Sequence, residues 1–238
     1  MGASVSERLV VCVATTRPDE ITSFGSVCTF IRDNSVTMRG VVESYQYLYE
    51  NTDAPVLAYF HDDIELYDEK WIERVLVEFG DPEVGVVGFG GAKAHGLAEL
   101  YTAPYKLTNL ARIGYLSNMR DAEDHGQRFH CSCDVAVLDG FALIVRRELL
   151  DKCGGWHPED WPPHHIYDYV LAAQAHRHGY KIRLVGVSCQ HFGGRTATTT
   201  KYLDWCKTTK WGSDQKMHEE GHRLFYERFR DVMPWRCL

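Results

Sequence analysis

Several features that would place this 238-residue chain in a special class are missing from its sequence. No apolar run approaches the roughly 18 residues that indicate a membrane-spanning helix. The N-terminus has no basic segment followed by an apolar stretch, so no secretory signal is expected. Basic residues are not in surplus, because 33 Asp and Glu outnumber 26 Lys and Arg, and a dedicated DNA-binding module usually shows the opposite balance. We therefore expect a cytoplasmic protein without a transmembrane segment.

Cysteine pairs of the CxxC type are also missing, although the chain has eight cysteines. Cys131 and Cys133 form a CxC pair, which is too small for a zinc site without further ligands. An even cysteine count is compatible with disulfides. A chain of this length can build a core without them, however, and we expect reduced thiols.

What the sequence does contain is ordinary for a globular domain, with 45% hydrophobic and 25% charged residues. The charge is uneven. Residues 195–238 carry 9 basic and 6 acidic side chains, whereas residues 1–194 carry a net charge of −10. The basic C-terminal segment can contact an anionic ligand or be a solvated surface.

Short apolar runs alternate with helical patterns along the chain. The runs predict buried strands at 9–14, 27–31, 55–60, 84–89, 135–145 and 182–189. The helical patterns cover 39–50, 68–79, 166–178 and 213–231. This alternation predicts an α/β layered fold with a largely parallel sheet. The polar segment from about 92 to 134 is expected to be a long functional loop.

Chemically active side chains follow several of these strands. Asp62 and Asp63 come directly after an apolar strand, and their carboxylates repel each other unless a cation or solvent compensates. A divalent metal ion is one such compensation, and a solvated turn is the alternative. His191 follows a later strand and is either a third ligand or a structural histidine. Ligands of parallel sheets bind at the carboxyl ends of strands, which is where these residues lie.

Five segments in order carry a family resemblance: the first strand with Thr15–Arg17, then Phe30–Ser35, Ala58–Leu66, Val137–Trp156 and His165–His191. Together they resemble nucleotide-sugar-dependent glycosyltransferases of the GT-A fold, specifically the family 2-like group. The resemblance covers about residues 9–194. It implies a Rossmann-like, mostly parallel sheet flanked by helices in a single catalytic domain, 1–194. The nucleotide-binding half would cover about 1–91 and the acceptor half about 92–194. Residues 195–238 would be a C-terminal helical extension packed on the same domain.

The resemblance also implies a site. The cation, Mn²⁺ or Mg²⁺, would be held by Asp63 and His191, with Asp62 as a further ligand. The nucleotide-sugar donor, with UDP favoured and GDP possible, would contact Thr15, Arg17, Asp33, Asp62, Asp139 and Arg195. Asp168 would be the general base of an inverting transfer to a hydroxyl group. Trp156, Trp161 and His165 would bind the acceptor. Asp139 is equally a turn residue before Gly140, and core packing is an equal explanation for both tryptophans.

Two departures from the family pattern stand out. The stretch from Asp33 to Asp62 is short, so the base-binding half is trimmed. Val170 stands where relatives often have a second acidic residue. This puts more weight on Asp168 and leaves the roles of Glu159 and Asp160 open.

Other interpretations remain. His218–His222 matches the HExxH pattern of zinc hydrolases, but Gly221 weakens the helix, and a solvated amphipathic helix is the simpler explanation. A non-catalytic nucleotide-sugar-binding domain is a further alternative. The acceptor could be a glycan, a protein, a small molecule or a modified DNA base, and a nucleic-acid partner rests only on the basic C-terminal segment.

Overall fold

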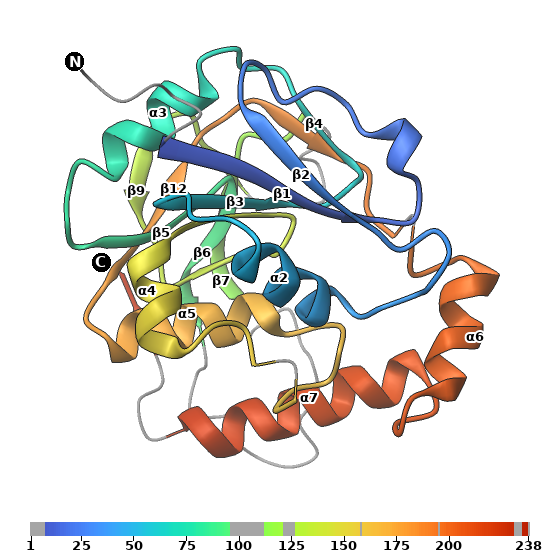
Figure 1. The fold of residues 1–238 in the computed structure, drawn as a ribbon. Helices are drawn as coiled ribbons and strands as arrows, with labels where there is room; N and C mark the ends of the chain where they lie inside the picture. Colours follow the sequence, from blue (N-terminus) through green and yellow to red (C-terminus); the bar gives the residue numbers. More distant parts are fainter. Residues whose placement is uncertain are drawn as a thin grey trace.

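The computed structural model describes residues 8–95, 112–120, 127–157, 159–194, 196–230 and 235–237. Its centre is a seven-stranded sheet, in which the order of neighbouring strands is β2, β1, β3, β11, β5, β12, β9 (Figure 1). The bounds are β1 Leu9–Thr15, β2 Cys28–Asp33, β3 Val56–Phe60, β5 Val84–Gly88, β9 Ser132–Asp134, β11 Ala142–Arg146 and β12 Lys181–Val185. Only β11 and β9 run against the other five strands. The predicted α/β class with a mostly parallel sheet is confirmed.

Helices cover both faces of this sheet (Figure 1). They are α2 Val41–Glu50, α3 Trp71–Glu78, α4 Arg147–Cys153, α5 Tyr167–Arg177, α6 Thr200–Thr208 and α7 Asp214–Phe229, besides a short 3-10 helix, Pro18–Glu20. Alternate residues of β1 enter two different cores because successive strand side chains point to opposite faces. Val10 and Cys12 pack with α2, α4 and α5, whereas Val11 and Val13 pack with α3.

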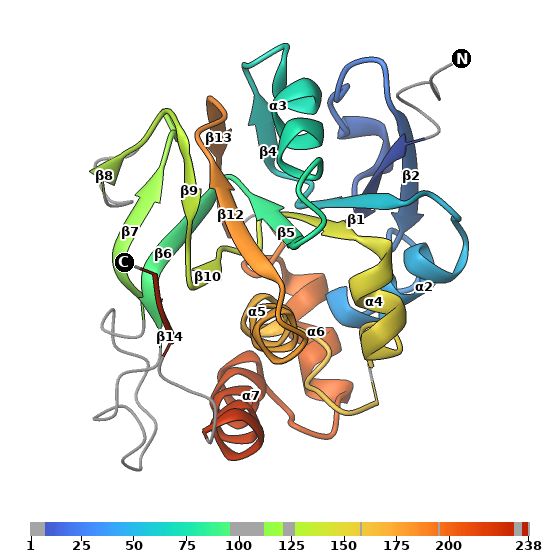
Figure 2. The same ribbon diagram turned by 90° about the vertical axis from the view of Figure 1, so that its left-hand side faces the viewer.

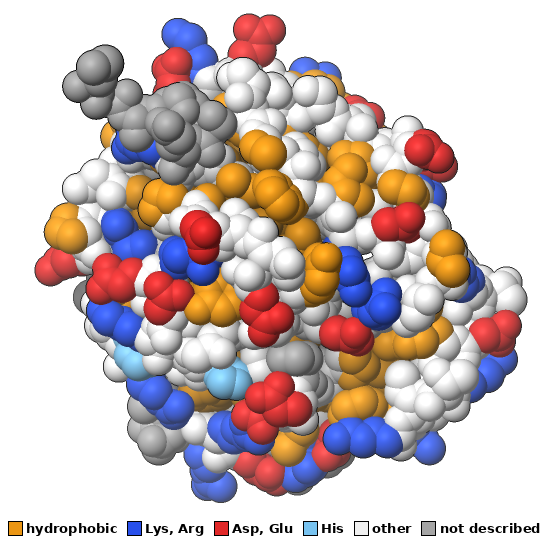
Figure 3. Space-filling model, viewed as in Figure 1, with side chains coloured by type: hydrophobic (Ala, Val, Ile, Leu, Met, Phe, Trp, Pro, Cys, Tyr) orange, Lys and Arg blue, Asp and Glu red, His pale blue; other side chains and the backbone are white. Residues whose placement is uncertain are grey.

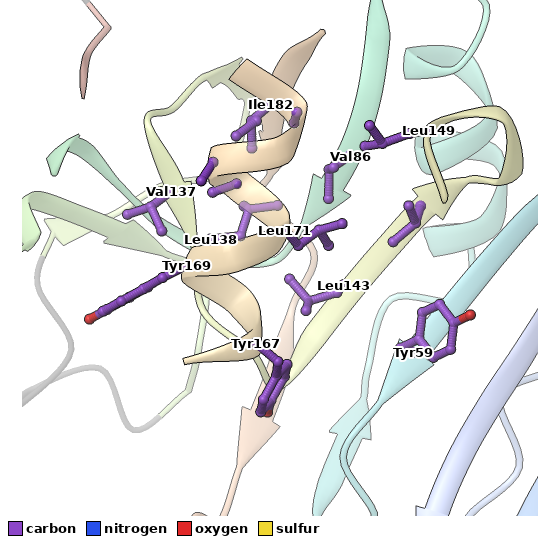
Figure 4. Packing of buried hydrophobic residues seen from close by; sticks show 14 of the residues in the cluster. Tyr59, Val86, Val137, Leu138, Leu143, Leu149, Tyr167, Tyr169, Leu171 and Ile182 are labelled. Carbon is purple, nitrogen blue, oxygen red and sulfur yellow. The ribbon is translucent and has the colours of Figure 1, made fainter. Parts of the chain in front are cut away.

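Helix α5 lies between the sheet and α7 (Figures 1 and 2). Leu171 of α5 points toward Val86 and Leu143 of the sheet (Figure 4). On its other side, Tyr169 contacts Phe225 of α7, with ring centroids 5.8 Å apart. The C-terminal helix is thereby part of the main hydrophobic core. The division into residues 1–194 and 195–238 stays a prediction.

A second, smaller sheet occupies part of the segment that the sequence suggested was a loop (Figure 2). It contains β6 Gly90–His95, β7 Arg112–Ser117, β8 Gln127–Arg128, β10 Val137–Leu138 and β14 Trp235–Arg236. The loop prediction for 92–134 is therefore wrong for its described parts, because polar strands with weak alternation gave no periodic signal. Residues 96–111 and 121–126 lie outside the described residues.

Two predicted strands are each divided in the structure. The expected strand 135–145 splits at Gly140 into β10, which joins the small sheet, and β11, which joins the large one. The expected strand 182–189 splits into β12 and β13, Cys189–His191. Strand β13 pairs antiparallel with β4, Ile64–Leu66, just beyond β3. Both breaks place side chains at the end of the large sheet that bears the candidate site.

On the face seen in Figure 3, Lys and Arg side chains are interspersed with Asp and Glu, and hydrophobic side chains gather where Figure 1 draws β2. Phe30 and Ile31 of this strand are 39% and 42% exposed. Within the described ranges, the helices include none that combines the length and apolar character needed to cross a membrane.

Candidate active site

The end of β1 holds one of the two adjacent aspartates. The Thr15 hydroxyl donates a hydrogen bond to Asp62 Oδ2 at 2.7 Å, and Arg17 Nη2 donates to the same oxygen at 3.2 Å. The Arg17 backbone N–H in turn donates to Thr15 Oγ1 at 2.9 Å. Thr15 is buried, as is the Asp62 side chain. Asp62 is therefore fixed by the Thr15 hydroxyl and the Arg17 guanidinium at the carboxyl end of β1. The positive charge of Arg17 compensates the charge of the Asp62 carboxylate.

Asp63 lies beside two histidines. Its Oδ1 lies 3.2 Å from His191 Nε2 and 3.9 Å from His61 Nδ1, and the two ring nitrogens lie 3.3 Å apart. The antiparallel pairing of β13 with β4 brings His191 here, with His191 opposite Ile64. One ligand atom from each of the three residues lies within 4.8 Å of the others. We call His61, Asp63 and His191 the His–Asp–His cluster.

The electrostatics of this cluster favour a neutral imidazole at His61. Burial lowers the pKa of His61 below its ordinary value, and the charge of His191 lowers it further. A neutral imidazole offers one lone pair to a cation. His61 Nε2 lies 2.5 Å from the Tyr167 hydroxyl, so Nδ1 is the nitrogen that faces Asp63 and His191. Tyr167 thus orients His61 as an outer hydrogen-bond partner commonly orients a metal-binding histidine.

A cavity of about 120 Å³ opens beside these residues, and we call it the donor-side cavity. Its lining includes Thr15, Thr16, Asn34, Arg39, His61, Asp62, Asp63, His164 and Thr196. Arg39 supplies a positive charge to its wall, and Tyr45 and Met38 supply apolar surface. A wall of this kind suits a planar or sugar-like group that carries negative charge.

Asp168 occupies a second cavity, of about 150 Å³. It lies in the first turn of α5, where its carboxylate accepts a hydrogen bond from the Tyr169 backbone N–H at 2.9 Å. The helix N-terminus stabilises negative charge at this position. The two residues before α5, His165 and Ile166, have positive φ values of 69° and 51°. A β-branched residue rarely adopts this conformation, so the backbone that presents Asp168 is strained.

The C-terminal helix forms part of the same cavity, which we call the acceptor-side cavity. It is lined by Asp139, Gly140, His165, Ile166, Tyr167, Asp168, Tyr169, His218 and His222. His165 Nε2 lies 2.6 Å from Asp214 Oδ1, at the start of α7. The Tyr202 hydroxyl of α6 donates to the same Asp214 oxygen. Gly221 lets α7 approach closely, since a Cβ there would lie only 3.0 Å from Ile166 Cγ1.

The sequence between β2 and the end of α7 assigns the chain to a family. Residues 31–229 match the model of a family described as "Glycosyltransferase like family", and this range contains the His–Asp–His cluster and Asp168. The chain belongs to this glycosyltransferase-like family. The resemblance predicted from the sequence motifs and the enzyme class, a glycosyltransferase, are confirmed by this membership. No curated protein matches the chain in sequence.

Solved structures of glycosyltransferases resemble the enzyme more distantly. A mannosyltransferase from Pyrobaculum calidifontis, in complex with GDP-Man and Mn²⁺, is 13% identical at a TM-score of 0.47, over 83% of this chain and 59% of that one. GalNAc-T7 with UDP, GalNAc and Mn²⁺ is 10% identical at a TM-score of 0.49, over 77% and 43% of the two chains. TarS from S. aureus, in complex with UDP-GlcNAc, is 10% identical at a TM-score of 0.46, over 94% of this chain and 74% of that one. These distant likenesses carry no conclusion about substrates.

The structure of the glycosyltransferase brings most of the predicted site residues together. Thr15, Asp62 and Asp63 line the donor-side cavity, and Asp139, His165 and Asp168 line the acceptor-side cavity. Asp139 Oδ2 also accepts a hydrogen bond from the Tyr115 hydroxyl at 3.2 Å. Asp62 is not part of the His–Asp–His cluster, so its predicted role as a metal ligand gains no support, and its role beside Thr15 and Arg17 stays a prediction.

Other predicted residues lie elsewhere in the enzyme. Asp33 is exposed, and its carboxylate accepts a hydrogen bond from the Ser35 backbone N–H within a turn. Hydrogen bonds from the Ser35 hydroxyl and from this N–H lower the pKa of the Asp33 carboxyl. Trp156 packs in the core against Tyr45 and Tyr59, and Trp161 stacks on Phe229. Both tryptophans are only 6% exposed and line neither cavity, so core packing explains them better than acceptor stacking. Arg195 lies outside the described residues.

Three further residues were not chosen from the sequence: His61, His218 and His222. His61 stood beside the recognised aspartates, but only the fold shows its ring next to His191. His218 and His222 had a visible signal, because their spacing puts both on one face of a helix. The zinc-hydrolase alternative gains no support, since no third metal-ligand residue of the described chain joins these two. Glu219 of that motif is exposed and accepts a hydrogen bond from Gln215.

Another gathering of possible ligands lies away from both cavities. His157, Glu159 and Asp160 have ligand atoms within 4.8 Å of one another, but both acids are exposed. Asp160 is already paired with Arg228 at 3.1 Å. This surface cluster provides a control for metal binding at the His–Asp–His cluster.

Proposed function

We propose that the protein is a metal-dependent, inverting glycosyltransferase, which moves a sugar from a nucleoside diphosphate sugar to a hydroxyl acceptor. The observation that carries this proposal is the His–Asp–His cluster, in which a buried carboxylate meets two imidazoles and of which His61 and Asp63 line the donor-side cavity. Family membership supports the transfer chemistry. The cluster supports the metal dependence, since a carboxylate and imidazoles at this spacing are the donor set of a divalent transition metal.

The ligand chemistry favours Mn²⁺ over Mg²⁺. Imidazole nitrogen suits transition metals, whereas Mg²⁺ prefers an all-oxygen octahedron and keeps several waters. His61, Asp63 and His191 would hold the ion. When bound, the cation would neutralise the negative charge that develops on the departing diphosphate.

The residues around the cluster would bind and orient the donor. Asp62, held by Thr15 and Arg17, offers a second carboxylate oxygen to a ribose hydroxyl or a base N–H at the end of β1. Asp33, at the end of the neighbouring strand β2, would contact the nucleotide at the rim of the site. Arg195 remains proposed for the diphosphate. UDP-sugars are the first donors to test, followed by GDP-sugars.

Asp168 would take the proton of the attacking hydroxyl. Asp168 is 7% exposed as a residue and lines a separate cavity, and its carboxylate is oriented at the N-terminus of its own helix. A base positioned apart from the leaving group permits attack on the opposite side of the anomeric carbon, which gives inversion. Asp139, in the same cavity, would contact the sugar or the acceptor. A cytoplasmic location also stays a prediction.

The test is a donor panel of UDP-, GDP- and dTDP-sugars with Mn²⁺ or Mg²⁺, with and without chelator, in which released nucleotide is measured. We expect release from one donor class, its loss with chelator and its recovery with Mn²⁺. Asp63→Asn should remove this release, and the exposed Asp53→Asn is the matched control. Turnover that persists in chelator would contradict metal dependence, and failure of every donor to bind would contradict the function.

A further inference from the structure

Helix α7 turns two histidines toward the cavity that contains Asp168. His218 and His222 are one helical turn apart, and both line the acceptor-side cavity with Asp139 and Asp168. Their rings continue a row of aromatic contacts. His165 and His218 have ring centroids 4.8 Å apart, His218 and His222 5.0 Å, and His222 and Tyr169 5.5 Å. Part of the lining of the cavity that contains the proposed base is therefore contributed by α7.

The row is held in place from both sides. Asp214, at the first position of α7, accepts hydrogen bonds from the Tyr202 hydroxyl and from His165 Nε2. This interaction fixes His165 against α7. On the far side, His222 is 2% exposed and packs against Tyr169. His218 is more accessible than His222, so it can be changed with less risk to folding.

The lining has a distinct chemistry. A neutral imidazole offers one hydrogen-bond donor and one acceptor, and a carboxylate offers acceptors only. Sugar hydroxyls both donate and accept, so they can pair with each of these groups. None of the described residues that line this cavity is Lys or Arg. A phosphate group would enter next to two carboxylates without a compensating cation, which is unfavourable in a partly desolvated site.

We propose that His218 and His222, with His165, form an acceptor subsite that takes an uncharged, polyhydroxylated group and rejects one that carries a phosphate near the reacting hydroxyl. This inference rests on the proposed function, because the subsite serves the acceptor of the transfer. It adds a substrate class and assigns specificity to the C-terminal helix. The cavity of about 150 Å³ accommodates a single sugar-sized ring rather than a large planar group.

The test compares neutral monosaccharides with their 6-phosphates as acceptors, using the donor found in the donor panel and detecting product by mass spectrometry. We expect the wild-type enzyme to prefer the neutral member of each pair at least tenfold. His218→Ala should raise the acceptor KM about tenfold and affect the donor KM much less. His218→Gln keeps one donor and one acceptor group, so it should restore most of the acceptor affinity.

His218→Lys provides the sharper variant, because it places a cation beside the two carboxylates. We expect it to shift the preference toward the phosphorylated acceptor by about tenfold. His178→Lys, on an exposed histidine just after α5, is the matched control and should leave the preference unchanged. A wild-type preference for phosphorylated acceptors, or an unchanged preference in His218→Lys, would overturn the proposal.

Binding measurements keep this proposal separate from the proposed function. Saturation-transfer NMR with the same neutral and phosphorylated monosaccharides needs no turnover. If no donor reacts but the neutral sugar still binds preferentially and His218→Lys reverses the preference, the subsite stands and the transfer reaction fails. If donors react and both sugars bind equally in the wild type, the transfer reaction stands and the subsite fails.

Discussion

The two cavities of this enzyme share one end of a sheet but differ in their charge chemistry. The donor-side cavity combines Arg39 with the His–Asp–His cluster, and Arg17 holds Asp62 next to it. The acceptor-side cavity pairs two carboxylates with three imidazoles, and no Lys or Arg is among its described lining. Under the proposed function, the guanidinium and the bound cation of the donor side would attract an anion, and the carboxylates and imidazoles of the acceptor side would pair with hydroxyl groups. The difference matches the proposed ligands, a diphosphate on one side and an uncharged nucleophile on the other.

The comparison depends most on Asp168. Asp168→Asn removes the proposed base but keeps the size of the side chain, so the rate of transfer should fall by about 10²- to 10⁴-fold. Donor affinity should change little, since the donor-side lining does not include Asp168. Product formation and nucleotide binding are measured on the same preparation. Transfer within a few-fold of the wild type would remove the role assigned to Asp168.

The donor side is tested through His61. His61→Gln removes a proposed ligand and should weaken Mn²⁺ binding at least as much as loss of an outer hydrogen-bond partner does, which is about 10- to 100-fold. Mg²⁺ binding should change less, because imidazole contributes less to its coordination. Titration calorimetry with each ion measures both effects. His157→Gln, in the surface cluster with Glu159 and Asp160, is the control and should leave Mn²⁺ affinity unchanged. Equal losses of Mn²⁺ affinity in both variants would show that the ion binds at a site other than the His–Asp–His cluster.

The two sides meet where α2 touches the segment before α5. A Cβ at Gly40 would lie 2.2 Å from the Pro163 carbonyl oxygen, an atom that also accepts the Val42 N–H. Gly40→Ala should therefore destabilise the fold by about 1–3 kcal/mol, or lower Tm by about 2–12 °C. It should raise both KM values, because Pro163 lies next to His164, which lines the donor-side cavity, and close to His165, which lines the acceptor-side cavity.

Thermal unfolding and the two KM values check the Gly40 prediction. Val36→Ala, at an 89% exposed side chain nearby, is its control and should leave Tm unchanged. A Gly40→Ala variant with wild-type Tm would show that the backbone shifts at this contact without a loss of stability, which would contradict the prediction.

The smallest expected effect is the pH dependence of stability that His218 contributes. Burial lowers the pKa of His218 below its ordinary value of 6.5, and His165 lowers it further, while Asp214 and Glu219 oppose the shift. As the pH falls below 6.5, the unfolded chain takes up a proton more readily than the folded one, so stability decreases. At pH values well above 6.5 the ring stays neutral and this contribution is constant.

The His218 prediction is checked with urea unfolding at two pH values, one about a unit above and one about a unit below the ordinary histidine pKa. His218→Gln should lose slightly less stability between the two pH values than the wild type, and the exposed His178→Gln should behave as the wild type. His61 and His176, whose pKa values are also lowered by burial, contribute alike to all three proteins. An identical loss in His218→Gln and wild type would contradict the assignment.

Local patterns predicted the parallel strands and their ends well, because a buried strand followed by polar residues is a short-range signal. Thr15, Asp62, Asp63 and His191 were recognised in this way. Pairings between distant segments left no such signal. The pairing of β4 with β13, which places His191 on Asp63 beside His61, depends on chain segments far apart in sequence.

The helix 213–231 shows the same limit. Its amphipathic pattern predicts an inward face with Leu224, Phe225 and Phe229; Phe225 and Phe229 are buried, whereas Leu224 is only partly buried against the core. The pattern could not say what that face would meet, so the histidines that line the acceptor-side cavity were interpreted as part of a solvated helix. The break at Gly140 was missed for a similar reason. An apolar run alone does not indicate that its two halves join different sheets. Glycine is needed at position 140 because a Cβ there would lie 2.5 Å from the Tyr167 hydroxyl.

Tyr167 and Asp168 are neighbours in the first turn of α5, and they serve the two cavities separately. Tyr167 contacts His61 of the cluster, and Asp168 lines the acceptor-side cavity; Figure 4 shows Tyr167 and Tyr169 leaving this turn on different sides. Consecutive Cα atoms are about 3.8 Å apart, so a single peptide unit joins the hydrogen-bond partner of the proposed metal site to the proposed base. Every nucleoside diphosphate sugar has one oxygen between its second phosphorus and its anomeric carbon. Under the proposed function, the link between Tyr167 and Asp168 would keep the same spacing of leaving group and base for donors that differ in their sugar.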